Sequence, residues 1–312
     1  MRPLLARMRH DSGQAMLFMV FALMGLVAMT SLVIDGGSWL RTQRQVQTAA
    51  DAAALAGAQD IPFQSTARTT AINYAQQNFS GIAAPIVTFP GVSEIDVVAE
   101  RPVSGIFLPA LSATARAHAR AAVSVPLSMK NVAPVTLRDT QACFISNPSC
   151  FNHTVTINFD YSAVAPGMYG LINVECYSDT SSNCGSGSLG GNALQNVIEN
   201  GYPAVLPSQK WYGIKTGNTV GPVDHGLEDA ADAHKTLLFP VWDQVSAADK
   251  TFHIIGWTAF VITPDRTGVN WTSQKKTLTG HFTTFIATDV AGGGGAPGGT
   301  SDFGVHVVNL TE

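Results

Sequence analysis

The stretch that decides the fold is Ala15–Ile34, which reads AMLFMVFALMGLVAMTSLVI. Its twenty residues carry no charge, and the least apolar of them, Thr30 and Ser31, lie near its end. A helix of about 20 apolar residues spans the roughly 30 Å hydrocarbon core of a bilayer. No other segment of the sequence is comparable in length and apolar character. We therefore predict one transmembrane helix over residues 15–34.

The flanks of this stretch predict its direction across the membrane. Residues 1–14 carry three arginines and one aspartate, whereas the other flank begins with Asp35 and has its first cation at Arg41. Short flanks rich in arginine stay in the cytoplasm. We expect residues 1–14 to be cytoplasmic, the helix to lie in the inner or plasma membrane, and the remainder to be extracytoplasmic.

A cleaved signal peptide is the alternative to a retained anchor. Its apolar region would be about 7–15 residues long and would end at a small-x-small site. The apolar run here is longer, and no triplet of that type follows it closely: Ala54–Ala56 begins twenty residues after the run ends. The pattern favours a retained anchor.

A helical pattern continues in Trp39–Ala58, WLRTQRQVQTAADAAALAGA, which is rich in helix-forming residues. Trp39 stands where an interfacial aromatic residue belongs. Helical spacing places small residues on one face, where they predict close packing against another helix. That helix is either the chain's own next one, predicted over 66–79 with Ser65 as its N-cap, or one of a second subunit in a homo-oligomer. The stripe comprises Val46, Ala49, Ala50, Ala53 and Ala56.

Beyond residue 90 the pattern changes from helical to alternating. Strands predicted at 92–101 and 113–125 flank an apolar bend and complete a small α+β region over 35–125. Residues 126–134 separate it from a mostly β ectodomain over 135–312. There we predict strands at 154–161, 169–177, 237–245, 251–263, 277–287 and 303–310, and short helices at 192–200 and 224–235, with the last strand at an edge or in a hairpin. The fold class is α+β.

Four cysteines form two pairs that are close in sequence: Cys143 with Cys150, and Cys176 with Cys184. An even count in an extracytoplasmic region predicts two disulfides. Local pairing is favoured, and cross-pairing of the two loops is the alternative. A zinc site competes, but neither pair has the tight spacing of a zinc knuckle.

The composition argues against a nucleic-acid partner. Charged residues make up 13% of the chain, and from Asp35 onward 15 Lys and Arg stand against 21 Asp and Glu. Binding to nucleic acid needs a basic face, and no basic run with interleaved aromatic residues is present.

Two polar clusters are candidate cation sites, and both have a simpler interpretation. A loop within the second cysteine pair offers Asp179, Ser181 and Asn183, whose oxygen atoms would suit Mg²⁺. A second group lies on one side of the helix at 224–235: His225, Glu228, Asp229 and Asp232. Neither has the spacing of a metal motif. A polar disulfide loop and a solvated acidic face are favoured.

No motif for nucleophilic catalysis or phosphate binding is present. We expect no catalytic residue, no cofactor and no metal. One alternative function rests on aromatic residues that could line a carbohydrate-binding groove of a surface adhesin, although core packing is the more usual role of such residues. They are Trp211, Tyr212, Trp242, Trp257 and Trp271.

The stretch Gly13–Ala58 contains several short motifs: Gly13-Gln14, Phe21-Ala22-Leu23, Asp35-Gly36-Gly37, Arg41, Val46-Gln47 and the ending ADAAALAGA at 50–58. With these motifs the stretch resembles the N-terminal module of TadG-like Flp pilus-assembly proteins. The resemblance is clear to about residue 125 and fainter beyond.

The resemblance implies a cell-envelope protein of the tight-adherence pilus system. Such a protein has one membrane anchor, an exported C-terminal region, no catalytic activity, and pilus-assembly proteins as partners. Pilin-like relatives carry Glu five residues after the glycine at which they are cleaved. Phe18 holds that position relative to Gly13, so prepilin processing is not expected. The anchor and helix-packing residues are then Gly13, Phe18, Asp35, Trp39, Val46, Ala49, Ala50, Asp51, Ala53 and Ala56.

Overall fold

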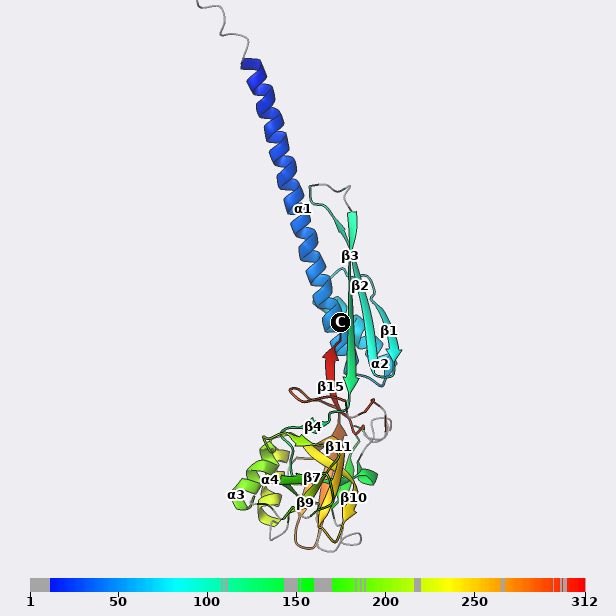
Figure 1. Cartoon of the computed structure of the whole chain (residues 1–312), viewed down its shortest axis with the longest axis vertical. Helices are drawn as coiled ribbons and strands as arrows, with labels where there is room; N and C mark the ends of the chain where they lie inside the picture. Colours follow the sequence, from blue (N-terminus) through cyan, green and yellow to red (C-terminus); the bar gives the residue numbers. More distant parts are fainter. Residues whose placement is uncertain are drawn as a thin grey trace, which may run out of the picture.

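A long helix, a sheet packed along its lower half and a β-rich lobe follow one another along the molecule (Figure 1). The computed structural model describes residues 12–107, 109, 112–142, 151, 153–159, 170–182, 184–185, 187, 189–215, 220–264, 267–293, 295–297, 299 and 302–311. We call the lower half of the helix and the sheet against it the stem, and the β-rich part the C-terminal lobe.

Helix α1 (Ser12–Ala58) is unbroken over 47 residues and unites the predicted transmembrane helix with the alanine-rich helix. At 1.5 Å per residue it is about 70 Å long. Side chains of residues 15–30 are all exposed, whereas one face is buried from Val46 onward. Its first half is long and apolar enough to cross a membrane. The helix is thus consistent with a single membrane span that continues into a folded stem.

Helix α2 (Gln64–Asn78) packs beside the end of α1 and buries Ala67, Ala71 and Ala75. It begins two residues earlier than predicted, and Phe63 occupies the N-cap position without a side-chain hydrogen bond. The prediction of Ser65 as the N-cap was therefore wrong. Ser65 lies inside the first turn, where its carbonyl accepts a hydrogen bond from the Thr69 hydroxyl.

The stem sheet has the strand order β1-β2-β3-β15-β14. Its strands are β1 (Ile86–Gly91), β2 (Glu94–Ser104), β3 (Ser112–Ser124), β15 (Val305–Leu310) and β14 (Phe285–Ile286). β2 and β3 form a long antiparallel hairpin in register from Glu94↔Ala122 to Ser104↔Ser112. Arg116, His118 and Arg120 alternate outward along β3, and the alanines between them are buried.

The C-terminal strand β15 joins the two parts of the molecule. Its first residues pair in parallel with β14, and Val307–Leu310 pair antiparallel with β3. Val305 and Val307 belong to the core of the C-terminal lobe, whereas Val308 packs on the core of the stem. The strand is thus interior rather than at an edge, and the predicted ectodomain over 135–312 returns a strand to the stem.

A buried, hydrogen-bonded pair of a histidine and an aspartate lies at this junction. Nε2 of His306 is 2.9 Å from Oδ1 and 3.0 Å from Oδ2 of Asp302, and both side chains are fully buried. Oδ1 of Asp302 also accepts a hydrogen bond from the backbone amide of Gly304. Burying a charge is costly unless it is paired and hydrogen-bonded, so these contacts are needed to stabilise the turn into β15.

The C-terminal lobe is a mixed sheet with two helices beside it. Strands β12-β13-β11-β10-β5 form the main path, β6 pairs with β13, and β7 and β9 extend from β11. Helices α3 and α4 pack against each other. The elements are β4 (Ser128–Met129), β5 (Leu137–Arg138), η1 (Asp139–Gln141), β6 (Val155–Asn158), β7 (Ile172–Ser178), α3 (Gly191–Asn200), β8 (Leu206–Pro207), β9 (Lys210–Ile214), α4 (Val220–Asp232), β10 (Thr236–Ser246), β11 (Thr251–Ile262), β12 (Val269–Trp271) and β13 (Lys276–Thr283).

Four of the five aromatic residues considered for a carbohydrate-binding groove lie in the core of the lobe. Trp242, Trp257, Trp271 and Tyr212 are at most 1% exposed. Trp211 is half-buried, and its ring packs on that of His253. Core packing, the interpretation favoured from the sequence, is thus confirmed for the four buried residues, and their burial contradicts the alternative of a carbohydrate-binding groove. These large rings fill the space between the sheet and the elements packed on it.

One of the two expected disulfides lies among the described residues. Cys176 and Cys184 are bonded, with their Cα atoms 5.5 Å apart. The local pairing predicted for this pair is confirmed, and the zinc interpretation is excluded for it. Cys143 and Cys150 lie outside the described residues, so their pairing stays a prediction.

Candidate functional site: the stem and its membrane-proximal hairpin

The small-residue stripe of α1 packs on the chain's own stem. Val46, Ala49, Ala50 and Ala53 are fully buried, and Ala56 is nearly so. They meet α2 and the inner face of β2 and β3. Packing against the chain's own next helix is thus confirmed, with the sheet as an additional partner. The same burial contradicts a homo-oligomer through this stripe, because the chain itself covers the face.

Small side chains on both surfaces bring the helix close to the sheet. The inner face of β3 presents alanine at each inward position from Ala115 to Ala121, and all are buried. Alanine on alanine gives up apolar area but shortens the distance between backbones. The short distance lets polar side chains of α1 reach the strand's backbone.

Two glutamines of α1 make that contact. Nε2 of Gln43 donates to the carbonyl of Arg116 at 2.6 Å, and Nε2 of Gln47 donates to that of His118 at 3.1 Å. The next carbonyl of this edge, at Arg120, accepts from the amide of Thr311. An unpaired strand edge invites pairing with another chain. These donors occupy the edge of β3 where β15 no longer pairs with it.

Gly57 allows the tightest approach in the stem. A Cβ atom there would lie 2.6 Å from Cδ1 of Ile95 and 2.9 Å from both the Ala67 carbonyl oxygen and Cβ of Ala71. No side chain fits at such distances. The glycine of the ADAAALAGA motif is therefore required where α1, α2 and β2 meet.

The outer face of the stem sheet carries a charge cluster. Oδ1 of Asp96 lies 2.7 Å from Nε2 of His118, and Oδ2 lies 3.2 Å from Nη2 of Arg120. Partial burial by itself raises the pKa of Asp96. Hydrogen bonds from His118 and Arg120, together with their positive charges, outweigh that effect, so the pKa lies below its ordinary value.

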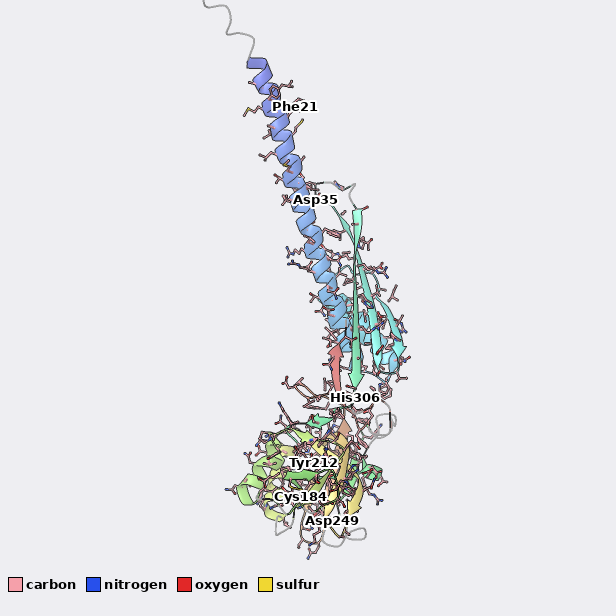
Figure 2. All side chains as sticks on the ribbon, viewed as in Figure 1. Phe21, Asp35, Cys184, Tyr212, Asp249 and His306 are labelled. Atoms are coloured by element: carbon pink, nitrogen blue, oxygen red, sulfur yellow. A yellow bond between two sulfur atoms is a disulfide. The ribbon has the colours of Figure 1, made fainter. Side chains whose placement is uncertain are left out.

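The tip of the β2–β3 hairpin is fastened to α1 just beyond the apolar run. Oδ1 of Asp35 accepts hydrogen bonds from the backbone amides of Ile106 at 2.7 Å and Phe107 at 3.2 Å. The Asp35 side chain is buried in this contact. Figure 2 shows Asp35 at the level of the hairpin tip, with Phe21 farther along the free part of the helix.

The structure places the remaining predicted anchor residues along the same helix. Gly13 lies in its first turn, Phe18 is 72% exposed and Trp39 is 41% exposed. Asp51 accepts a hydrogen bond from Gln47 at 2.7 Å. Gln43, Gln47 and Gly57 were not predicted as contact residues. Only Gly57 had a signal, as the single glycine in an alanine-rich run.

The candidate cation sites are ordinary polar surfaces. Asp179 pairs with Lys210, and the Ser181 hydroxyl donates to Asp249 at 2.9 Å. Hydrogen bonds from Ser246 and Ser181 lower the pKa of Asp249. Asn183 lies outside the described residues.

On α4, Nδ1 of His225 is 3.9 Å from Glu228. Asp229 accepts from Gln195 at 2.9 Å. Within the described ranges, no group of three or more His, Cys, Asp or Glu residues is placed to hold a metal ion.

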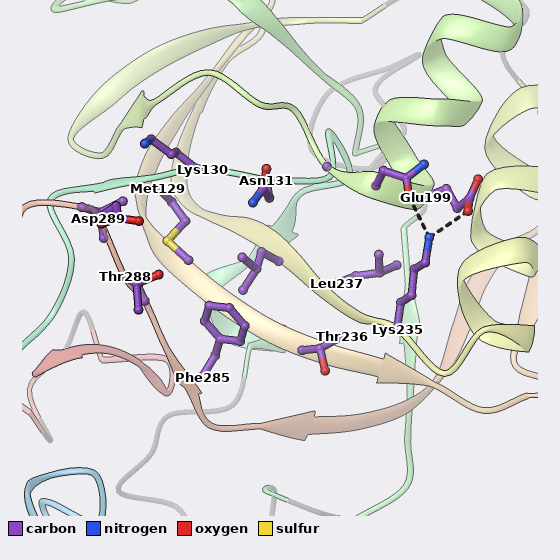
Figure 3. Close-up of a pocket in the computed structure, with 15 residues that line it drawn as sticks. Met129, Lys130, Asn131, Glu199, Lys235, Thr236, Leu237, Phe285, Thr288 and Asp289 are labelled. Atoms are coloured by element: carbon purple, nitrogen blue, oxygen red, sulfur yellow. Dashed lines mark hydrogen bonds and ion pairs between the residues drawn. The ribbon is translucent and has the colours of Figure 1, made fainter. Parts of the chain in front are cut away.

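A cavity of about 450 Å³ lies in the C-terminal lobe, where the end of α3, the start of β10 and residues 285–290 meet (Figure 3). Nζ of Lys235 donates hydrogen bonds to Glu199 at 2.8 Å and to Asn200 at 2.7 Å. The positive charge of Lys235 is thus already paired with residues that line the cavity. No nucleophile with an adjacent base is paired among the residues lining the cavity. We assign it no function.

Comparison with known proteins identifies the first part of this site. Residues 13–60 match the family model described as Flp pilus-assembly TadE/G-like. These residues form a TadE/G-like domain. The matched segment is α1 together with the two residues after it, which includes Gly57 and the small-residue stripe. The proteins of that family are components of Flp pilus assembly and are generally non-catalytic. No curated protein and no solved structure matches the chain.

Proposed function

We propose that this chain is a single-pass membrane protein that acts as a non-catalytic scaffold in the assembly of a Flp-type pilus. The observation that carries the proposal is the match of residues 13–60 to the TadE/G-like family, because that segment is the helix that leaves the apolar run and becomes the stem. Its role is to hold an exported lobe at a fixed place beside the membrane.

The proposed topology has residues 1–14 in the cytoplasm and the stem and lobe outside. Arginine in the short N-terminal flank supports this direction. The Cys176–Cys184 disulfide supports it independently, because disulfides persist in oxidising compartments outside the cytoplasm.

The surfaces left for pilus-assembly partners are the outward face of α1 and the free surfaces of the lobe. The inward face of α1 is used by the chain's own stem. Leu40, Arg41 and Arg44 stay exposed on the helix above the stripe. A partner that meets the scaffold near the membrane would contact this outward face or the apolar run itself.

Gene deletion followed by complementation tests the proposal. We expect loss of pili and of adhesion on deletion, and recovery with the full chain. A matched variant carries residues 35–312 behind a cleaved signal peptide, so that the lobe is exported without its anchor. We expect this variant not to restore pili. Normal pili after deletion would contradict the proposed function.

A further inference from the structure

We propose that the tip of the β2–β3 hairpin, at residues 105–107, is a second membrane-contact element that inserts into the boundary between headgroups and acyl chains. The bilayer is the one that α1 spans, so the inference rests on the proposed membrane span over 15–34. It assigns a lipid contact to a part of the chain that the TadE/G-like match over 13–60 does not include.

The chemistry of the tip fits a lipid boundary. In the sequence, residues 105–111 read GIFLPAL and include no charged and no hydrogen-bonding side chain. Ile106 is 64% exposed and Phe107 is 55% exposed. The strands below the tip carry charges on their outer face, such as Glu100 and Arg116. Apolar side chains gathered at one exposed end of a polar hairpin mark a surface that is covered in the working protein.

The position of the tip identifies the cover. The amides of Ile106 and Phe107 bind the carboxylate of Asp35, and Asp35 is the first residue after the apolar run. The hairpin runs along α1 with its tip toward the apolar half of the helix (Figure 1). Trp39, one turn below Asp35, is 41% exposed, as an interfacial aromatic residue would be. The tip is thus at the level where the helix leaves the bilayer.

A notch, the cavity between α1 and the β2–β3 hairpin, also fits lipid as its occupant. A cavity of about 210 Å³ opens there, and its wall includes Leu32, Trp39, Val103 and Ala113. Leu32, which is 61% exposed, belongs both to this wall and to the exposed apolar surface of α1. A bilayer around the helix would fill the notch with lipid and reach the tip without any rearrangement of the stem.

A second contact changes what the anchor can do. A single helix is free to rotate about its own axis in a bilayer and to change its tilt. Two contacts joined by the Asp35 hydrogen bonds define a plane, and they fix which face of the stem and lobe is turned toward neighbouring proteins.

Depth-dependent fluorescence quenching tests this inference on the full chain in vesicles of phosphatidylethanolamine and phosphatidylglycerol. An environment-sensitive NBD label is attached to Phe107→Cys, with Ile106→Cys as a second tip position. Met24→Cys, inside the apolar run, reports the span. Val92→Cys is a matched control because Val92 is 67% exposed at the opposite end of the sheet. The chain without an added cysteine measures labelling of the native cysteines.

We expect lipids with a nitroxide near the headgroup to quench the label at 106 or 107 at least threefold more than at 92. Deep nitroxides should quench it most strongly at 24. If both tip positions behave like 92 while 24 is quenched, the inference is overturned and the proposed span is retained. This includes the case in which a protein partner, absent from the vesicles, covers the tip. If 24 is not quenched, the span fails, and with it both the proposed anchor and this inference.

Discussion

The carboxylate of Asp35 on α1 accepts a 2.7 Å hydrogen bond from the backbone amide of Ile106, 71 residues farther along the chain. This contact fastens the end of a long hairpin to the helix at the limit of the apolar run. If α1 spans the membrane as proposed, this contact sets the height of the stem relative to the bilayer.

Asp35→Ala should free the hairpin tip. Hydrogen bonds to a charged group contribute about 1.5–3 kcal/mol, so we expect the amides of Ile106 and Phe107 to exchange with solvent at least tenfold faster. Hydrogen exchange with mass spectrometry measures this. Asp35→Asn keeps an acceptor and should be intermediate. Asp51→Ala, whose carboxylate contacts Gln47 on the same helix, is the matched control. Unchanged exchange at 106 and 107 in Asp35→Ala would show that the contact does not hold the tip.

Gly57→Ala should destabilise the stem although alanine is the better helix former. The added Cβ would lie 2.6 Å from Cδ1 of Ile95, and overpacking of this kind costs about 1–3 kcal/mol. Gly36→Ala is the control, because no atom lies within 4 Å of its added Cβ, and it should be neutral or stabilising by about 0.5–1 kcal/mol. The free energy of opening of α2, from native-state hydrogen exchange, distinguishes the two. Equal effects of both substitutions would refute the close-packing argument.

Asp96 should make the stem sensitive to acid. Its folded-state pKa is lowered by His118 and Arg120, so the carboxylate stabilises the fold at pH values above its ordinary pKa of about 4. That contribution is lost as the pH falls through the lower folded-state value. Asp96→Asn should therefore lower the thermal unfolding temperature of the stem at pH 7, and this effect should shrink as the pH falls below about 4. A stability difference that does not depend on pH would contradict this role.

The Cys176–Cys184 disulfide should stabilise the C-terminal lobe by about 2–3 kcal/mol, because it closes a short loop in the unfolded chain. Chemical denaturation of the Cys176→Ala/Cys184→Ala variant measures the loss. Peptide mapping without reduction should recover this pair and, as the sequence predicts, Cys143 joined to Cys150. Recovery of a Cys143–Cys176 peptide would disprove local pairing.

Local patterns predicted the helices and most strands, because each depends on a few neighbouring residues. The apolar run, the alanine stripe and the alternation along β3 were all visible in sequence. The N-cap prediction at Ser65 failed because the local preference for small polar residues does not foresee Phe63 at that position. For the tryptophans the sequence favoured core packing but left a groove open, since aromatic residues suit both, and only the packing of the lobe distinguishes the two.

Contacts between distant residues were not predictable. The return of β15 to β3 joins Leu310 with Ala121, and nothing in either strand specifies the other. Gln43 and Gln47 look like ordinary exposed helix residues until the edge of β3 is placed beside them. The sequence therefore predicted the helix of the candidate site, whereas the packing of the sheet against that helix became visible only in the structure.

The most direct test of the scaffold proposal is photo-crosslinking in cells that assemble the pilus. A photoreactive amino acid replaces Leu40, on the outward face of α1, or Met29, in the apolar run, and a matched control replaces Val92 at the far end of the sheet. We predict that Flp pilus-assembly proteins are captured from 40 or 29 and not from 92. Capture of none of these proteins from either position, in cells with normal amounts of the chain and of pili, would contradict the account.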